Sequence, residues 1–205
     1  MGLLSAGSTL TRLKVINSVS AEILRGVPDA LAKNCFKDID QTTDERSYGW
    51  VCFDNFLDSA WKTAPPEKAE FLAFALRLDT RRIAPAIFRK HFMIAMEKEQ
   101  AEKDGENRKY ISKNRKYEIR EQVKFRLMSK TLPVPAVFDV SWNIHDNIIY
   151  FGSIRDKIVD MFMDHFKKSF GLDLERLTPY CLARGFVNPG LLHKLESAES
   201  VDFGK

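Results

Sequence analysis

Four carboxylates stand on or beside predicted strands and are the first candidates for chemistry: Asp54, Asp79, Asp139 and Asp146. A metal-dependent nuclease needs two or three carboxylates that converge on Mg²⁺, usually with a lysine nearby. Asp79 is followed by Arg81 and Arg82, which favours an ion pair or a turn cap over catalysis. The sequence does not bring the four carboxylates together, so an exonuclease is kept as an alternative and no catalytic residue is assigned.

Other signatures of catalysis and metal binding are absent. The sequence contains no glycine-rich phosphate loop, no HExxH, no GxSxG, and no GxGxxG after a strand. Its cysteines and histidines are scattered without metal-ligand spacing: Cys35, Cys52, Cys181, His91, His145, His165 and His193. We therefore expect no metal, no cofactor and no disulfide, and such cysteine usage suits a reducing cytoplasm.

The strongest chemical signal is a block of positive charge from Arg108 to Lys130. Nine basic residues stand there against two acidic ones, Glu118 and Glu121. The net charge of this block, +7, exceeds the +4 of the whole chain, so the remaining residues carry −3. Charge of one sign on one predicted helix attracts polyanions such as nucleic acids. A solvated lysine-rich helix without a partner is the alternative.

Two predicted helices position this block. The first begins at Pro85, where the missing N–H costs nothing, and runs to about Lys103. The second follows a short polar loop, with Ser112 as its N-cap. Each helix is apolar only near the end that lies far from the loop. This pattern predicts an antiparallel helical hairpin whose tip projects into water.

The second helix carries two adjacent stripes. Basic residues spaced three and four apart form one stripe, which we expect to contact DNA: Lys113, Lys116, Arg120 and Lys124. Apolar residues form the other, which we expect to pack on the first helix or to make a dimer contact with a partner's hairpin: Ile119, Val123 and Leu127. The basic residues therefore flank a contact and do not occupy a separate outer face.

The other elements alternate strands with helices. Residue alternation and β-branched or aromatic content predict strands at 9–17, 48–53, 136–144 and 148–151, and a last strand is expected at 174–182. The apolar run 70–79 suits a helix or a strand; we expect a strand from Phe71, because Asp79-Thr80 marks a break before the helix at Pro85. A helix from Ala21 to Phe36 is interrupted at Gly26 and Pro28, which predicts a kink or two short pieces. A further helix follows Ser153, with Asp156 completing a capping box, and ends at Gly171.

This order, βαββ, then the hairpin, then ββαβ, predicts the α+β class. We expect a largely antiparallel sheet, or sheets, with helices on one face and a projecting antiparallel helical hairpin. The chain divides into a first sheet-forming half (1–83), the hairpin (84–132), a second sheet-forming half (133–186) and a loosely ordered tail (187–205).

The sequence predicts no membrane partner. No window approaches an apolar run long enough to cross a bilayer. The first residues, MGLLSAGSTLTRLKV, lack a basic leader and a long apolar segment, so a secretion signal is not expected. Ala6 stands where a myristoylation signal needs Ser or Thr. We therefore expect a cytoplasmic protein.

Three segments resemble the recombination-associated protein RdgC family. They are FALRLDTRRIAPAIFRKH (74–91), RKYISKNRKYEIREQV (108–123) and WNIHDNIIYFGSIRDKIVDMFMDHFKKSFGLDLERLTPYCLA (142–183). The most distinctive parts are LRLDTRR, the FGS turn and FGLxLxxLTPY, in that order. The similarity extends from the first predicted strand to about Ala183.

The resemblance implies a bacterial, nucleoid-associated protein that binds single- and double-stranded DNA without sequence preference and restrains RecA-driven recombination. It implies a homodimeric ring around a positively charged hole, with the helical hairpin as the tip. It marks Arg108, Lys109 and Lys113 on the tip, and Arg81 and Arg82 after the LRLD strand, as DNA contacts. Longer family members continue well beyond the LTPY segment, whereas this sequence ends at Lys205. An open clamp or another oligomer is therefore kept beside the closed ring.

Three hypotheses of function follow. The first is a DNA-binding homodimer that limits RecA-type recombinases. It predicts affinity that falls steeply with salt and hardly varies between DNA sequences, because no recognition helix, zinc finger or RNP motif is present to read bases. The second is the metal-dependent exonuclease, an activity with which the family has been labelled and which these residues do not support. The third is a protein-interaction module whose charge only keeps it in solution.

Overall fold

The structure, a computed structural model, describes residues 9–104 and 110–197. Within these residues seven strands form one sheet, in the order β2-β4-β5-β6-β1-β7, with β3 beside β4, and every strand pair is antiparallel. The strands are β1 (Thr11–Val15), β2 (Arg46–Cys52), β3 (Glu67–Lys68), β4 (Phe71–Thr80), β5 (Val134–Asn143), β6 (Ile148–Phe151) and β7 (Leu174–Arg176). The predicted α+β class is confirmed.

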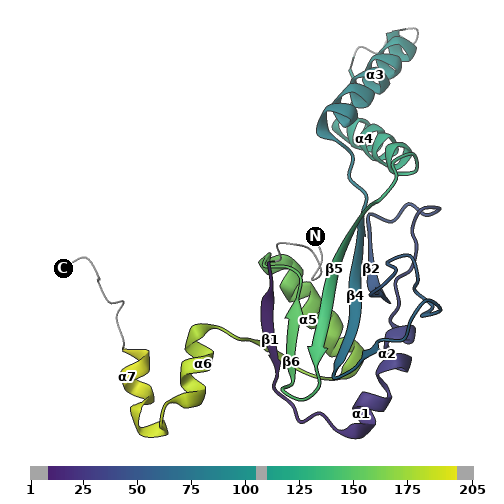
Figure 1. The fold of residues 1–205 in the computed structure, drawn as a ribbon. Coiled ribbons are helices and arrows are strands. Elements are labelled where there is room, and N and C mark those ends of the chain that lie inside the picture. The colour runs from purple at the N-terminus through teal and green to yellow at the C-terminus, as the bar shows by residue number, and fades with distance from the viewer. Residues whose placement is uncertain (1–8, 105–109, 198–205) are drawn as a thin grey trace.

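The long pair β4 and β5 forms the middle of the sheet. Its register runs from Phe71 opposite Asn143 to Thr80 opposite Val134. The C-terminal end of β4 and the N-terminal end of β5 therefore lie side by side, and the hairpin projects from this end of the strand pair (Figure 1). The two predicted sheet-forming halves contribute strands to one shared sheet, because β1 of the first half pairs with β6 of the second, and β4 of the first pairs with β5 of the second.

Three helices cover one face of the sheet. These are α1 (Ala21–Arg25), α2 (Val27–Lys33) and α5 (Asp156–Phe170). Helix α5 ends at Gly171 as predicted, since Gly171 adopts the left-handed conformation at φ 70°. Fully buried aromatic rings fill the space between helices and sheet: Trp50, Phe74, Trp142, Phe151, Phe162 and Phe166. The predicted division of the first helix into two pieces at Gly26 is confirmed.

On the other face, β4 carries a buried ion pair. Arg77 donates through Nε and Nη2 to the two carboxylate oxygens of Asp79 at 2.8 and 2.7 Å. The Phe36 ring lies 4.2 Å from the guanidinium. Asp79 therefore forms an ion pair, but with Arg77 and not with the arginines that follow it, because residues two apart on a strand share a face.

The hairpin consists of α3 (Pro85–Asp104) and α4 (Lys113–Met128) and projects from the sheet edge as predicted (Figure 1). The side chain of Ser112 caps α4 by accepting a hydrogen bond from the backbone N–H of Arg115 at 3.2 Å. Two short links connect the hairpin to the sheet: residues 81–84 join β4 to α3, and residues 129–133 join α4 to β5.

The C-terminal part of the sequence prediction is partly wrong. Strand β7 stops at Arg176, and the rest of the predicted strand belongs to α6 (Pro179–Phe186), capped by the Thr178 hydroxyl and opened by Pro179. The predicted loose tail contains η1 (Pro189–Leu191) and α7 (Leu192–Glu196). In Figure 1 these helices stand away from the sheet.

The predicted capping box before α5 is also wrong. Arg155, not Ser153, occupies the N-cap position, and no side chain caps the helix. The backbone carbonyl of Ser153 accepts a hydrogen bond from the Thr11 hydroxyl at 2.6 Å. Ser153 is thus held at the end of the sheet, and the helix begins only at Asp156. Across the described ranges, no helix is long and apolar enough to cross a membrane.

Candidate nucleic-acid interface

The two hairpin helices pack through the apolar stripe of α4. Ile119, Val123 and Leu127 are buried against apolar side chains of α3 and the link before it. Their partners are Ile83, Phe88, Phe92, Ala95 and Met96. The predicted dimer contact through this stripe is therefore wrong, because α3 already covers the three side chains. The alternative that the same prediction left open, packing on the first helix, is correct.

An open groove of about 1010 Å³ lies at the base of the hairpin, where α3 and α4 meet the end of β4. Four exposed basic side chains line it: Arg82, Arg89, Arg120 and Lys124. Of the described acidic residues, only Glu45 lines it. The tertiary structure thus gathers cations from the link, from α3 and from α4 around one concave surface.

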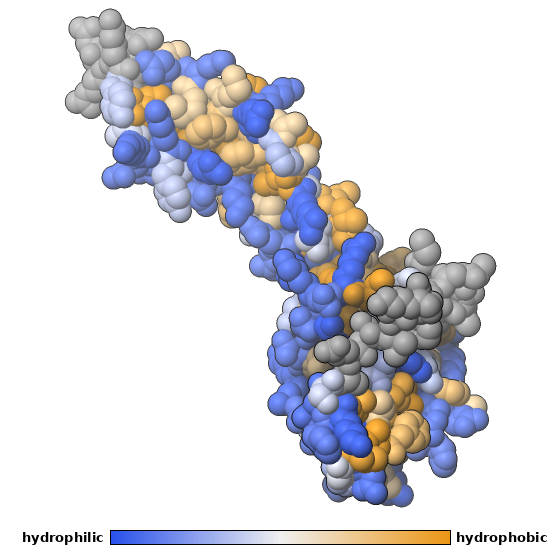
Figure 2. All heavy atoms as spheres, turned by 90° about the vertical axis from the view of Figure 1, so that its left-hand side faces the viewer, coloured by the Kyte–Doolittle hydropathy of each residue, from blue (hydrophilic) through white to orange (hydrophobic). Residues whose placement is uncertain are grey.

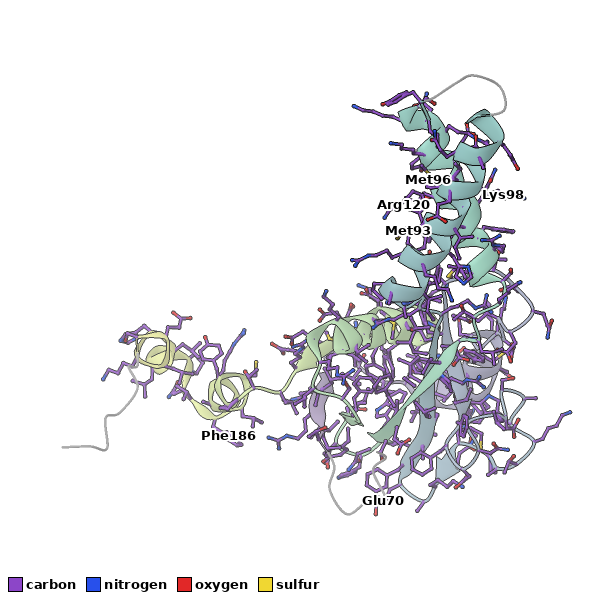
Figure 3. The ribbon with its side chains drawn as sticks, turned by 90° about the horizontal axis from the view of Figure 1, so that it is seen from above. Glu70, Met93, Met96, Lys98, Arg120 and Phe186 are labelled. Carbon is purple, nitrogen blue, oxygen red and sulfur yellow. The ribbon has the colours of Figure 1, made fainter. Side chains whose placement is uncertain are left out.

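Aromatic rings form the apolar part of this groove. Phe88 and Phe92 stack with a centroid distance of 6.1 Å and an interplanar angle of 7°, and both are half-buried. The guanidinium carbon of Arg120 lies 5.3 Å from the centre of the Phe88 ring. Figure 3 shows Arg120 near Met93 and Met96 of α3, with Lys98 on the other side of the hairpin. Figure 2 shows apolar surface running along the hairpin between hydrophilic side chains.

Lys124 is the one groove cation with an ion pair among the described residues. Its Nζ lies 2.6 Å from a carboxylate oxygen of Glu45, and both side chains are exposed. This hydrogen bond, together with the charge of Glu45, raises the pKa of Lys124. Arg82, Arg89 and Arg120 form no ion pair with any residue that the structure describes. These three arginines are therefore the groove cations most available to an anion.

The opposite side of the hairpin is different in charge. Arg115 donates to both carboxylate oxygens of Glu99 at 2.9 Å and to Glu118 at 2.9 Å. The hydrogen bonds to Glu99, then those to Glu118, raise the pKa of Arg115. A smaller groove of about 430 Å³ on this side is lined by both signs of charge, including Glu102 and Arg126. Positive charge that is not neutralised therefore concentrates on the first side.

The predicted DNA contacts divide into three groups. Arg82, Arg120 and Lys124 come together in the groove, while Lys113 and Lys116 are exposed farther toward the tip. Lys116 lies 5.8 Å from the ring centre of Tyr110. The predicted contacts Arg108 and Lys109 lie outside the described residues.

Arg81 is the exception, and its prediction as a DNA contact is corrected. Only 4% of Arg81 is exposed. Its guanidinium donates to the backbone carbonyls of Ile39, Asp40 and Thr42. These bonds tie the loop before β2 to the end of β4, so Arg81 shapes the base of the groove without offering its charge to a phosphate.

Sequence reasoning missed Arg89 and the stacked phenylalanines. Phe88 and Phe92 are four residues apart, which is the ordinary spacing of core side chains on a helix. Arg89 lies outside the block of positive charge. Its place three residues before Phe92 on the predicted helix was the available signal, because that spacing brings two side chains to one side.

The four candidate carboxylates do not converge. Asp54 pairs with Lys68 at 2.7 Å, Asp79 with Arg77, and Asp146 accepts a hydrogen bond from Asn143. Asp139 lies opposite Ala75, four residues along β4 from Asp79. That offset separates the two carboxylates by about 13 Å, too far to share one ion. In the ranges 9–104 and 110–197, no group of three or more His, Cys, Asp or Glu side chains could hold a metal.

Comparison with known proteins adds no identification. A scan of the sequence against models of known protein families finds no match. No curated protein matches the sequence either. The resemblance to the RdgC family therefore stays a prediction.

Proposed function

We propose that this protein binds DNA without sequence preference through the basic groove at the base of its helical hairpin. The observation that carries the proposal is the convergence of Arg82, Arg89 and Arg120, all exposed and without an ion pair among the described residues, around the stacked rings of Phe88 and Phe92. Guanidinium groups bind phosphates bidentately and stack on planar rings. The positive side of the hairpin offers both kinds of contact.

The groove favours backbone contacts over base readout. Its cations are carried by long, exposed side chains on a projecting hairpin, which suits a phosphate backbone that passes across them. Together with the resemblance to the RdgC family, this supports a wider proposal. In it, the protein is a nucleoid-associated homodimer of the cytoplasm that binds single- and double-stranded DNA and restrains RecA-dependent recombination.

The two alternatives receive less support. An exonuclease would need carboxylates that converge, and three of the four candidates, Asp54, Asp79 and Asp146, have separate partners. An interaction module built on the apolar stripe of α4 would need Ile119, Val123 and Leu127 to be accessible, and all three are buried. A dimer, if formed, must use other surfaces.

A salt titration of DNA binding tests the proposal. The double variant Arg89→Glu/Arg120→Glu should lower the affinity for DNA at low salt at least about tenfold. It should also reduce the slope of log affinity against log salt by about two, one for each lost phosphate contact. Lys124 is left unchanged, because reversing its charge would also break its ion pair with Glu45.

The matched control places the same charge change on the other side of the hairpin. Lys98→Glu/Arg126→Glu replaces two exposed cations that line the mixed-charge groove. Lys98 lies 3.9 Å from Glu102, at the limit of an ion pair, and both side chains are exposed, so losing this contact costs little stability. This variant should keep most of the affinity and the original salt slope. Equal losses in the two double variants would show that only total charge matters, and the absence of DNA binding by the unmodified protein would refute the proposal outright.

A further inference from the structure

A second polar cavity, of about 240 Å³, lies at the sheet edge between α2, β2 and α5 and shares no lining residue with the basic groove. Four of its lining side chains can interact with an anion: Lys33, Lys37, Tyr48 and Lys168. No acidic side chain of the described residues lines it. Taking the volume of a water as about 30 Å³, the cavity can hold a tetrahedral oxyanion together with several waters.

The backbone fixes two walls of this cavity against each other. The segment after α2 runs beside β2, where Trp50 donates to the carbonyl of Asn34 at 3.1 Å and Phe36 donates to the carbonyl of Trp50 at 2.9 Å. Gly49 allows this approach, since a Cβ there would lie 2.5 Å from the backbone nitrogen of Phe36. The Ser47 hydroxyl donates to the carbonyl of Lys37 at 2.6 Å. The cavity is therefore formed before any ligand arrives.

The three lysines converge without a counter-charge. None of them forms an ion pair with a residue that the structure describes, whereas the neighbouring Lys167 pairs with Asp173 at 2.6 Å. Lys33 and Lys168 lie in the last turns of their helices, where the helix dipole favours a cation. That explanation does not extend to Lys37, which lies outside any helix. It also gives no reason for the three side chains to surround one cavity.

His165 adds a buried titratable group to the wall of this cavity. It is 7% exposed, and its Nε2 has no partner among the described residues. Its ring lies 4.5 Å from that of Trp50 and 5.2 Å from that of Tyr48. Burial lowers the pKa of His165 to about 4, with a smaller effect of Lys168, and a hydrogen bond with the backbone of Asn34 acts in the opposite direction. At neutral pH its imidazole is therefore uncharged.

We propose that this cavity binds a phosphate group, through the ammonium groups of Lys33, Lys37 and Lys168 and the hydroxyl of Tyr48, with the imidazole of His165 in its wall. The phosphate is either a free phosphate ion or a phosphate of a nucleic-acid backbone, since both present the same oxygens. An anion here balances three lysines that lack ion pairs among the described residues. The site does not depend on the basic groove of the hairpin.

A phosphate titration at neutral pH tests this site, with the imidazole resonances of His165 as the signal. Inorganic phosphate should shift these resonances in a saturable way, and sodium chloride at equal ionic strength should not. Lys37→Ala and Lys168→Ala should each weaken phosphate binding about tenfold, the value of one charge-assisted hydrogen bond. Lys157→Ala, an exposed lysine in the first turn of α5, is the matched control and should leave the affinity unchanged.

The same signal distinguishes the two sources of phosphate. An oligothymidylate that displaces phosphate from His165 assigns the site to a nucleic-acid backbone, and one that leaves the phosphate signal intact assigns it to a free anion. A shift that sodium chloride reproduces, or that survives both lysine variants, would overturn the proposal. This result is separate from the hairpin experiment, because Arg89→Glu/Arg120→Glu leaves the cavity intact.

Discussion

Arg81 and Arg82 are neighbours in the sequence with opposite roles. Arg81 is buried and holds three backbone carbonyls, while Arg82 is exposed in the basic groove. Successive side chains at the end of a strand point to opposite sides. One residue therefore joins two loops, and the next remains available for a ligand. The sequence of the LRLDTRR segment alone could not show which of the two arginines is buried and which is exposed.

At the residue scale, His165 predicts a pH dependence of stability. Its pKa is about 4 in the folded protein against an ordinary value of 6.5. Below pH 6.5 the imidazole of His165 is therefore protonated in the unfolded chain but stays neutral in the folded protein, which favours unfolding. Stability should be full above that pH and decline between 6.5 and about 4, by up to about 3 kcal/mol for this buried group. Urea unfolding in phosphate-free buffer over this range measures the decline.

Two variants identify the residue responsible for this decline. His165→Phe keeps a ring beside Trp50 and Tyr48 but cannot bind a proton, so it should remove most of the decline. His145→Gln changes an exposed histidine in the turn before β6 and should leave the decline unchanged. If His165→Phe loses stability with pH as steeply as the original protein, other groups control the acid response.

At the element scale, the hairpin has a small core of its own. Leu127 is buried against α3, whereas Phe125, two residues earlier on α4, is 63% exposed. Leu127→Ala should therefore reduce the stability of the hairpin by about 2 to 3 kcal/mol, through lost burial and a cavity. Phe125→Ala should change it by less than about 0.5 kcal/mol.

Hydrogen exchange of the backbone amides measures this effect locally. The amides of α3 and α4 should exchange faster in Leu127→Ala, while those of β4 and β5 should be unaffected, because the hairpin joins the sheet only through two short links. Faster exchange throughout the sheet would instead show that hairpin and sheet unfold as one unit.

At the scale of the whole molecule, the sheet and its helices contain the main core, and α6 and α7 stand apart from it (Figure 1). No side chain of α6 or α7 is buried, and Phe186 is 89% exposed. A chain that ends at Leu177 should therefore keep its free energy of unfolding within about 1 kcal/mol of the original. Urea unfolding followed by tryptophan fluorescence measures this, since Trp50 and Trp142 lie in the core.

Limited trypsin digestion gives an independent check of the same arrangement. Cleavage at Arg184 should precede cleavage within the sheet, because the α6 backbone has little packing to protect it. A truncated chain that loses several kcal/mol would indicate that these helices support the core after all.

Much of the fold follows from local patterns. Alternation along 136–144, the proline at position 85 and the capping serine at 112 each predict an element that the structure contains. The strand at 71–79 was predicted from the break at Asp79-Thr80, because its apolar run suits helix and strand equally. The prediction failed after Arg176, where the Thr178 cap and Pro179 start a helix within an apolar run that also suits a strand. Short apolar runs do not distinguish the two, because their periodicity is incomplete.

The sequence by itself determined that positive charge is concentrated on one helix of a hairpin. Only the tertiary structure decided which cations can meet a ligand. Packing of α4 on α3 buries the apolar stripe, ion pairs neutralise Arg115 and engage Lys124, and the end of β4 buries Arg81. The same folding brings Arg82 and Arg89 beside Arg120 and gathers three separate lysines around His165. Charge is a property of composition, whereas its availability depends on which neighbours the fold supplies.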